Sequence, residues 1–222
     1  MRESPAKYCD ESERCAQLAA RLLVEGSAQT FDHARRKAAS RLNLTGARQL
    51  PDNRRLFSAL IEYQRLFDFP AVAKRTEKMR RAALIAMRFF EHFSPRITGA
   101  AMHGTPYGHS PITLHLFTDE SDAIARFLIE ERRPYRSSEV CFRVSKRDSE
   151  RFSCYETSND LFDYKLIAMP HRRLQQPPLS PVDGKPIRRL DYSGLEALVA
   201  EDPGGLYGCH AESLDPPRAG RE

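Results

Sequence analysis

Apolar positions recur every three or four residues through the first part of the chain, which predicts a series of amphipathic helices. The first helix is expected over residues 12–25. The second begins after Thr30, whose hydroxyl suits the N-cap position. Asp52 marks the start of a third helix, and residues 71–93 predict a longer fourth one. The first 94 residues are therefore interpreted as a helical region.

After Pro95 the pattern changes to short apolar runs separated by turn residues. Strands are expected over residues 96–102, 112–117, 140–144, 152–157 and 164–169, and helices over residues 119–132 and 193–200. The fold class predicted from this order is α+β, with an N-terminal helical region followed by a small mixed sheet and flanking helices. The three expected parts are residues 1–94, the sheet-bearing core of residues 95–174, and residues 175–222, a proline-rich extension with a short helix and a disordered tail.

Composition narrows the class of protein. The 222 residues are 41% hydrophobic and 29% charged, which excludes disorder along the whole length. No apolar run approaches the roughly 20 residues of a membrane helix, so we expect no membrane contact. The N-terminus lacks an apolar leader, and the five scattered cysteines show no CxxC spacing. A cytoplasmic protein with reduced thiols is therefore expected.

Charge is unevenly distributed. Residues 1–96 hold 19 Lys and Arg against 11 Asp and Glu, a balance of +8, whereas residues 97–222 hold 16 against 19, a balance of −3. The basic excess therefore belongs to the helical part. Such an excess favours phosphate-bearing partners, a nucleotide or RNA, although most basic stripes on helices are only solvated faces.

Residues 99–117 are the segment most suited to chemistry. A strand ends in small residues, Gly104-Thr105 follows, and a tight turn leads into the next strand. Such a turn can present backbone N–H groups to a phosphate, with the Thr105 hydroxyl as a further donor. Tyr107 beside it is a candidate for stacking on a base. An ordinary turn fits the spacing equally well.

Histidines are the other chemical feature of this segment. His103, His109 and His115 fall close together in the sequence, but without HxH or HxxxH spacing. We therefore favour histidines that pack or form hydrogen bonds in a polar cleft over a metal site.

The stretches Ile97-Thr-Gly-Ala-Ala-Met-His-Gly-Thr105 and His109-Ser-Pro-Ile-Thr-Leu-His-Leu-Phe117 resemble the signature of the polymerase β-type nucleotidyltransferase superfamily. More closely, the chain resembles an uncharacterised group of proteobacterial nucleotidyltransferase-like proteins. The further segments that carry this resemblance are Ala34-Arg-Arg-Lys-Ala-Ala39, Leu50-Pro-Asp-Asn53, Glu62-Tyr-Gln-Arg-Leu-Phe67 and Ser180-Pro-Val-Asp-Gly-Lys-Pro186.

The resemblance implies a nucleotidyltransferase-like sheet in which Gly104 and Thr105 cradle a triphosphate. Active members hold two Mg²⁺ ions with carboxylates on the motif strand, and here these positions are Pro111 and Thr113. A third carboxylate is expected on the strand over residues 164–169, which has none in its body, although Asp163 adjoins it. The ordinary metal triad is therefore absent.

Asp119 and Asp122 lie beyond the motif strand and are expected to cap the following helix.

Three hypotheses follow. The first is a degenerate nucleotidyltransferase-fold protein, a pseudoenzyme that binds a nucleotide or nucleic acid without metal-dependent transfer. The second is an active nucleotidyltransferase that uses Mg²⁺ and NTP with carboxylates from outside the motif. The third is a helical module that binds a protein partner. The candidate cleft residues are Gly104, Thr105, Tyr107, His109, Ser110, Thr113 and His115.

Overall fold

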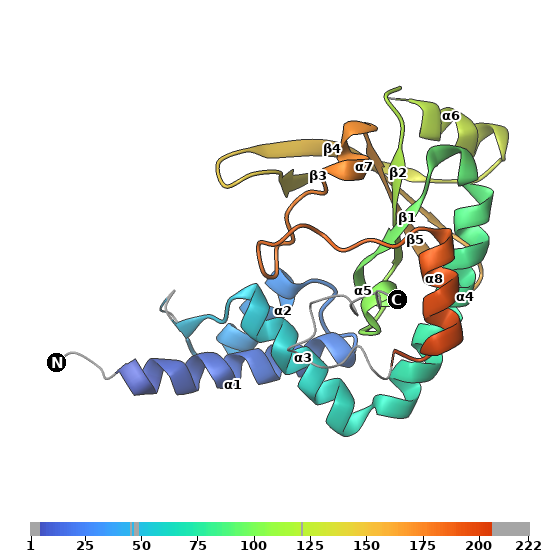
Figure 1. Ribbon diagram of the computed structural model, residues 1–222. Coiled ribbons are helices and arrows are strands. Elements are labelled where there is room, and N and C mark those ends of the chain that lie inside the picture. The colour runs from blue at the N-terminus through green and yellow to red at the C-terminus, as the bar shows by residue number, and fades with distance from the viewer. Residues whose placement is uncertain (1–4, 45, 47–48, 121, 206–222) are drawn as a thin grey trace, which may run out of the picture.

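The computed structural model describes residues 5–44, 46, 49–120 and 122–205. Three helices open the chain: α1 (Pro5–Val24), α2 (Phe31–Arg41) and α3 (Asn53–Phe67). Figure 1 shows them grouped together beside the sheet. Both expected helix starts are confirmed. The Thr30 hydroxyl accepts a hydrogen bond from His33 N at 3.2 Å, and the Asp52 carboxylate accepts one from Arg55 N at 2.8 Å.

Helices α1, α2 and α3 enclose a core built mainly of alanine and leucine. Cys15, Ala19 and Leu22 of α1 lie in this core, with Ala38 of α2 and Leu60 of α3. Small side chains on α1 and α2 allow the helices to approach closely, so that a short bundle buries its apolar faces.

The fourth helix, α4 (Phe69–Phe89), belongs to a different core, although it directly follows α3. Its Met79, Ala83 and Met87 pack in one cluster with Ile97 and Leu114 of the sheet. The division between the two cores therefore falls between α3 and α4, before the switch from helices to strands. A short 3₁₀ turn, η2 (Glu91–Phe93), completes the segment expected as one helix over residues 71–93.

The strands form a mixed five-stranded sheet in the order β1-β2-β5-β4-β3. Their bounds are β1 (Arg96–Thr98), β2 (Ile112–Phe117), β3 (Arg136–Arg143), β4 (Ser149–Ser158) and β5 (Asp163–Met169). Strands β2 and β5 run parallel, and the other neighbouring pairs are antiparallel. The predicted α+β class with a mixed sheet is thereby confirmed.

One strand is shorter than the sequence predicts. Residues 96–102 form a strand only up to Thr98, and α5 (Gly99–His103) follows at once. Gly99 has a φ of +73°, which turns the chain out of the sheet, and the run Ala100-Ala-Met102 then has high helix propensity. The remaining helices are α6 (Ala123–Glu130), α7 (Arg172–Gln175) and α8 (Tyr192–Glu201).

The two faces of the sheet are covered to different extents, and exposed residues remain on β3 and β4. Alternate residues of β2, including Leu114, face the core shared with α4, and Figure 1 shows α8 lying beside α4 on this flank. Thr113, His115 and Phe117 point to the other face, because residues two apart in a strand share a face.

Part of the proline-rich segment returns to the sheet. Leu190 exchanges two backbone hydrogen bonds with Ile97 of β1, of 2.9 and 3.1 Å. Leu179 N donates to Arg143 O at the end of β3 at 2.7 Å. The segment therefore satisfies backbone groups on both edge strands of the sheet.

Disorder is expected after Glu201, but residues 202–205 are described, and Gly205 packs against Gly104. The rest of the expected tail, from position 206 onward, lies outside the described residues. Among the helices that the structure describes, none has both the length and the apolarity needed to cross a bilayer.

Candidate functional site

The turn expected to cradle a phosphate is closed by protein atoms. A Cβ on Gly104, whose φ is +73°, would lie 3.0 Å from Gly205 Cα. Thr105 is only 3% exposed, and its N–H donates to Ala100 O at 3.0 Å. Backbone groups that are already paired and covered cannot cradle a ligand, so the expected open nest at Gly104-Thr105 is wrong in this structure.

Tyr107 and Ser110 complete the same turn. Tyr107 N–H donates to Ser110 Oγ at 2.9 Å, and Ser110 Oγ–H donates to Tyr107 O at 2.6 Å. The Tyr107 ring packs against Phe31 of α2, with 5.9 Å between ring centroids, and burial raises the pKa of its hydroxyl. Tyr107 is therefore partly buried and packs against the helical core, which explains its place in the turn without a base.

This turn docks the helical bundle onto the sheet. Gln64 of α3, which is buried, donates from Nε2 to Pro106 O at 2.6 Å. A Cβ on Gly108 would lie 3.1 Å from Leu23 O at the end of α1. The features that looked like a ligand turn are thus explained by packing between two parts of the chain.

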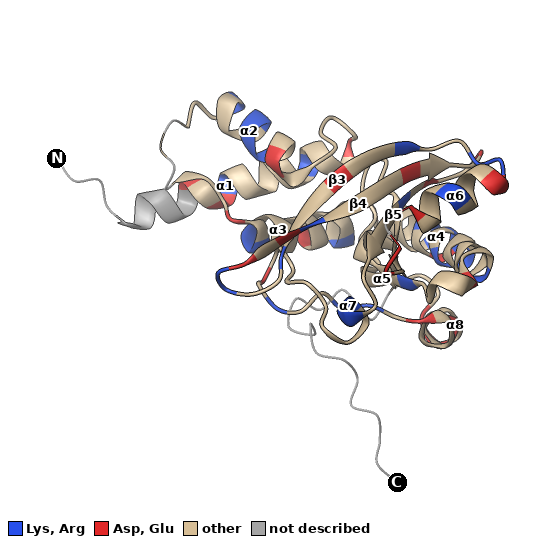
Figure 2. Ribbon diagram, turned by 90° about the horizontal axis from the view of Figure 1, so that it is seen from above, with Lys and Arg blue, Asp and Glu red and all other residues tan. Residues whose placement is uncertain are grey.

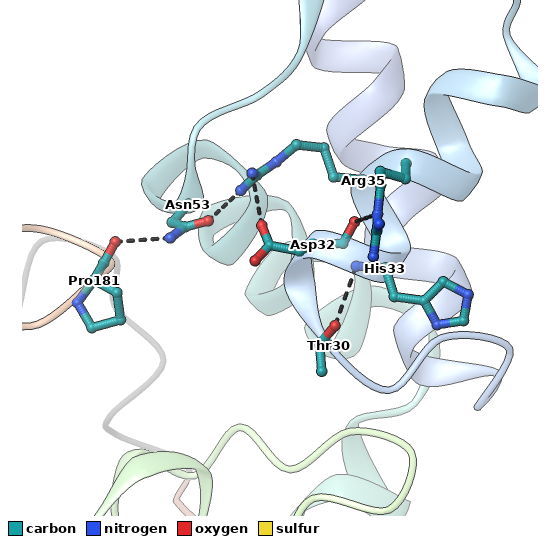
Figure 3. A network of polar contacts seen from close by, with 7 residues as sticks. Thr30, Asp32, His33, Arg35, Asn53 and Pro181 are labelled. Carbon is teal, nitrogen blue, oxygen red and sulfur yellow. Dashed lines mark hydrogen bonds and ion pairs between the residues drawn. The ribbon is translucent and has the colours of Figure 1, made fainter. Parts of the chain in front are cut away.

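A polar network makes a second connection (Figure 3). Arg35 of α2 forms an ion pair with Asp32 at 3.0 Å and donates to the Asn53 side chain at the start of α3. Asn53 Nδ2 in turn donates to Pro181 O at 2.9 Å. Asn53 and Pro181, which belong to two segments quoted for the resemblance, are therefore in direct contact.

A polar row crosses the second face of the sheet. Strand register places these side chains side by side: Thr98, Thr113, Lys165, Glu156 and Arg136. Thr113 and Lys165 are direct neighbours because β2 and β5 run parallel in register. At one end of the row the charges alternate, from Lys165 on β5 to Glu156 on β4 and Arg136 on β3.

A cavity of about 670 Å³ borders this row. Its wall includes Pro111, the first motif position, and Gln29 from the helical part. The charged and aromatic residues that line it are His109, Tyr135, Arg136, Glu156, Asp163, Tyr164 and Lys165. Of the expected cleft residues, His109 therefore lines this cavity, and Thr113 lies beside Lys165 at its edge.

The motif positions beside this cavity do not supply ligands for a pair of divalent cations. Proline and threonine stand at the two motif positions, and the neighbouring strand contributes the cation Lys165. Divalent Mg²⁺ requires oxygen ligands, above all carboxylates, and a lysine beside the site opposes it. Within the described ranges, no group of three or more His, Cys, Asp and Glu side chains is placed to hold a metal ion.

The three motif histidines occupy different environments. His109 is exposed at the cavity, whereas His115 is 1% exposed within the sheet, where burial and Arg189 lower its pKa to about 3. Burial, together with Arg188 and Arg80, lowers the pKa of His103 to about 4. The last two are thus neutral at pH 7.

Acidic residues lie beside basic ones on the helices (Figure 2), and some of them form ion pairs. Arg21 pairs with Glu25 at 2.6 Å, and Arg81 pairs with Glu77 at 3.0 Å. Ion pairs of this kind reduce the attraction of a helix face for phosphates.

The two aspartates that follow β2 do not cap a helix through their side chains. Asp122 occupies the N-cap position of α6 but makes no side-chain cap bond, and it pairs with Arg126 at 2.9 Å instead. Asp119 accepts a hydrogen bond from His171 N at 3.0 Å.

An apolar groove lies between α1 and α3. It has a volume of about 520 Å³ and is lined by Leu18, Tyr63, Leu66 and Phe67 among others. Leu66 and Phe67 are 61% and 72% exposed, which is unusual for such side chains. This groove is the feature most relevant to the hypothesis of a protein-interaction module.

Sequence reasoning missed most of the cavity wall. Lys165 lies on an expected strand, but its position beside Thr113 depends on the pairing of β2 with β5, segments about 50 residues apart. Tyr135 and Arg136 lie before the strand expected at residues 140–144, so their contribution had no local signal.

Comparisons of the chain with models of protein families, with curated proteins and with solved structures found no match.

Proposed function

We propose that this chain is a nucleotidyltransferase-like protein that binds a nucleotide in the cavity beside β2 without transferring a nucleotidyl group. The observation that supports the proposal is the pairing of Thr113 with Lys165 at the cavity edge. Where metal-dependent transfer needs carboxylates, the Thr113 hydroxyl stands beside Lys165, and Lys165 lines the cavity. That combination suits an anionic ligand better than a divalent metal ion.

The chemistry of the wall matches the parts of a nucleotide. Lys165 and Arg136 supply cationic donors for phosphate oxygens, and Tyr135 supplies an aromatic surface for a base. Glu156 and Asp163 can accept hydrogen bonds from ribose hydroxyls. At about 670 Å³ the cavity lies within the usual range of small-ligand sites, roughly 300 to 1,000 Å³.

Isothermal titration calorimetry of the full chain with ATP, GTP, CTP and UTP tests the proposal. Each nucleotide is titrated once with EDTA and once with Mg²⁺. We expect at least one nucleotide to bind in EDTA, because Lys165 and Arg136 can donate hydrogen bonds to its phosphate oxygens without a metal ion. If no nucleotide binds with or without metal, the proposal is wrong.

One observation favours active transfer as a second candidate. Asp163 and Glu156, two carboxylates from outside the motif, both line the cavity. Incubation with labelled NTP and Mg²⁺ or Mn²⁺ distinguishes the two functions. Incorporation of label that is lost in both Asp163→Asn and Glu156→Gln would replace the binding proposal with an enzymatic one.

A further inference from the structure

The cavity beside β2 presents hydrogen-bond acceptors as well as cations. Lys165 and Arg136 line it together with the carboxylates of Glu156 and Asp163. None of these four side chains forms an ion pair or a hydrogen bond with another group in the part of the chain that the structure describes. A ligand that carried only negative charge would bring no donor to the two carboxylates. The wall therefore favours a ligand that combines phosphate groups with hydrogen-bond donors.

The two carboxylates have different neighbours. In the register of the sheet, Glu156 on β4 lies between Lys165 on β5 and Arg136 on β3, so two cations offset its charge. Asp163, an exposed residue of β5, pairs in register with Ser158, which is neutral. Asp163 and Lys165 are two residues apart and face the same side of the sheet, separated by about 7 Å along the strand. Asp163 is therefore the carboxylate that can accept hydrogen bonds from a ligand held beside the cations.

A carboxylate distinguishes between bases because it only accepts hydrogen bonds, through two oxygens that lie side by side. Guanine presents two adjacent donors, N1–H and the N2 amino group, which match the two oxygens in one plane. On adenine and cytosine the amino group stands beside a ring nitrogen whose lone pair opposes the second oxygen. Uracil has a single N–H between two carbonyl oxygens. Guanine is therefore the base whose edge fits the Asp163 carboxylate best.

Other residues of the cavity fit the remaining parts of such a ligand. Lys165 and Arg136 lie two strand spacings apart, roughly 10 Å, on β5 and β3. A nucleotide whose base is bound at Asp163 can therefore place its phosphates over this row. Gln29, from the segment between α1 and α2, lines the same cavity, and its amide can donate to guanine O6.

We propose that the ligand of this cavity is a guanine nucleotide, whose N1–H and N2 amino group donate to the two oxygens of Asp163. Lys165 and Arg136 bind its phosphates, and Glu156 accepts hydrogen bonds from its ribose hydroxyls. The inference rests on the proposed function, since it identifies the base of the nucleotide that binds there. Asp163 is thus the specificity-determining residue of the site.

Calorimetric titration of the wild-type full chain with GTP, inosine triphosphate (ITP) and ATP in EDTA tests the choice of base. ITP lacks only the N2 amino group of GTP, so the two ligands differ by one donor. We expect GTP to bind about tenfold more tightly than ITP, because ITP loses a hydrogen bond to a charged group. ATP shares the phosphates and the ribose and should also bind about tenfold more weakly than GTP.

Asp163→Asn changes the requirement at one atom, because the amide offers one acceptor and one donor. The variant should lose the preference for GTP over ITP. It should gain affinity for xanthosine triphosphate, which carries a carbonyl oxygen where GTP has the N2 amino group. Asp160→Asn, at an exposed residue between β4 and β5 outside the cavity lining, is the matched control and should keep the preference for GTP. A preference for GTP that survives in Asp163→Asn would contradict the inference.

The same titrations separate this inference from the proposed function. If GTP, ITP and ATP bind the wild type with equal affinity, or if ATP binds most tightly, the cavity holds a nucleotide but Asp163 does not select guanine. That result would refute the inference alone. If none of the nucleotides binds, the proposed function fails and the inference fails with it.

Discussion

Thr113 on β2 and Lys165 on β5 are parallel-register neighbours that share the sheet face beside the cavity. The pair places a hydroxyl and a cation where the resemblance implies metal-binding carboxylates. A lysine at this position repels a divalent cation and attracts a phosphate, so the pair decides which ligand the wall favours.

We expect Lys165→Ala to weaken ATP binding about tenfold, because a charge-assisted hydrogen bond to a phosphate is worth about 1.5 kcal/mol. Lys146→Ala, at an exposed turn between β3 and β4, serves as the matched control and should leave the affinity unchanged. Calorimetric titration in EDTA measures both. Equal affinities for the two variants would place the ligand elsewhere.

Gly104→Ala should destabilise the fold by about 2 to 3 kcal/mol. An alanine at this position would have a strained backbone, because φ is +73°. Its Cβ would also lie 3.0 Å from Gly205 Cα. Gly184→Ala is the control, since Gly184 has a φ of +72° and nothing within 4 Å of an added Cβ. Gly184→Ala should lower the free energy of unfolding by only about 1 kcal/mol. Urea denaturation measures both, and similar losses would contradict the close contact between Gly104 and Gly205.

Arg80→Met should destabilise the fold by about 3 kcal/mol or more. Arg80 is 1% exposed and donates to the carbonyl oxygens of Ala101, Met102 and Asp202, which methionine cannot satisfy. Arg81→Met on the exposed side of α4 removes only an ion pair with Glu77 and should change stability by less than about 1 kcal/mol. The free energy of unfolding in urea tests this difference.

The stability of the fold should decrease as the pH falls below about 6.5. Folded His103 and His115 have pKa values lowered to about 4 and about 3, so the unfolded chain binds protons that the folded chain excludes. Each group contributes a slope of up to about 1.4 kcal/mol per pH unit between its unfolded and folded pKa.

Urea denaturation between pH 5 and pH 7 measures this slope, a range in which most carboxylates remain ionised. His115→Gln should flatten the slope, whereas His33→Gln on exposed α2 should not. A slope unaffected by His115→Gln would mean that this imidazole is not buried in its neutral form.

Local patterns in the sequence determined most elements of secondary structure. The caps at Thr30 and Asp52 and the period-two strand at residues 112–117 depend on neighbouring residues, so they could be predicted without knowledge of the fold. The absence of carboxylates at Pro111 and Thr113 could also be predicted, because it is a matter of residue identity alone.

Only the tertiary structure decided what these residues do. The turn at Gly104-Thr105 has the composition of a phosphate cradle, but contacts with Gly205 and the helical bundle close it. The cavity wall is built by the pairing of β2, β5, β4 and β3, and buried His115 packs near the Phe142 ring of β3. Such contacts join residues about 40 to 130 positions apart, so local sequence patterns carry no signal for them.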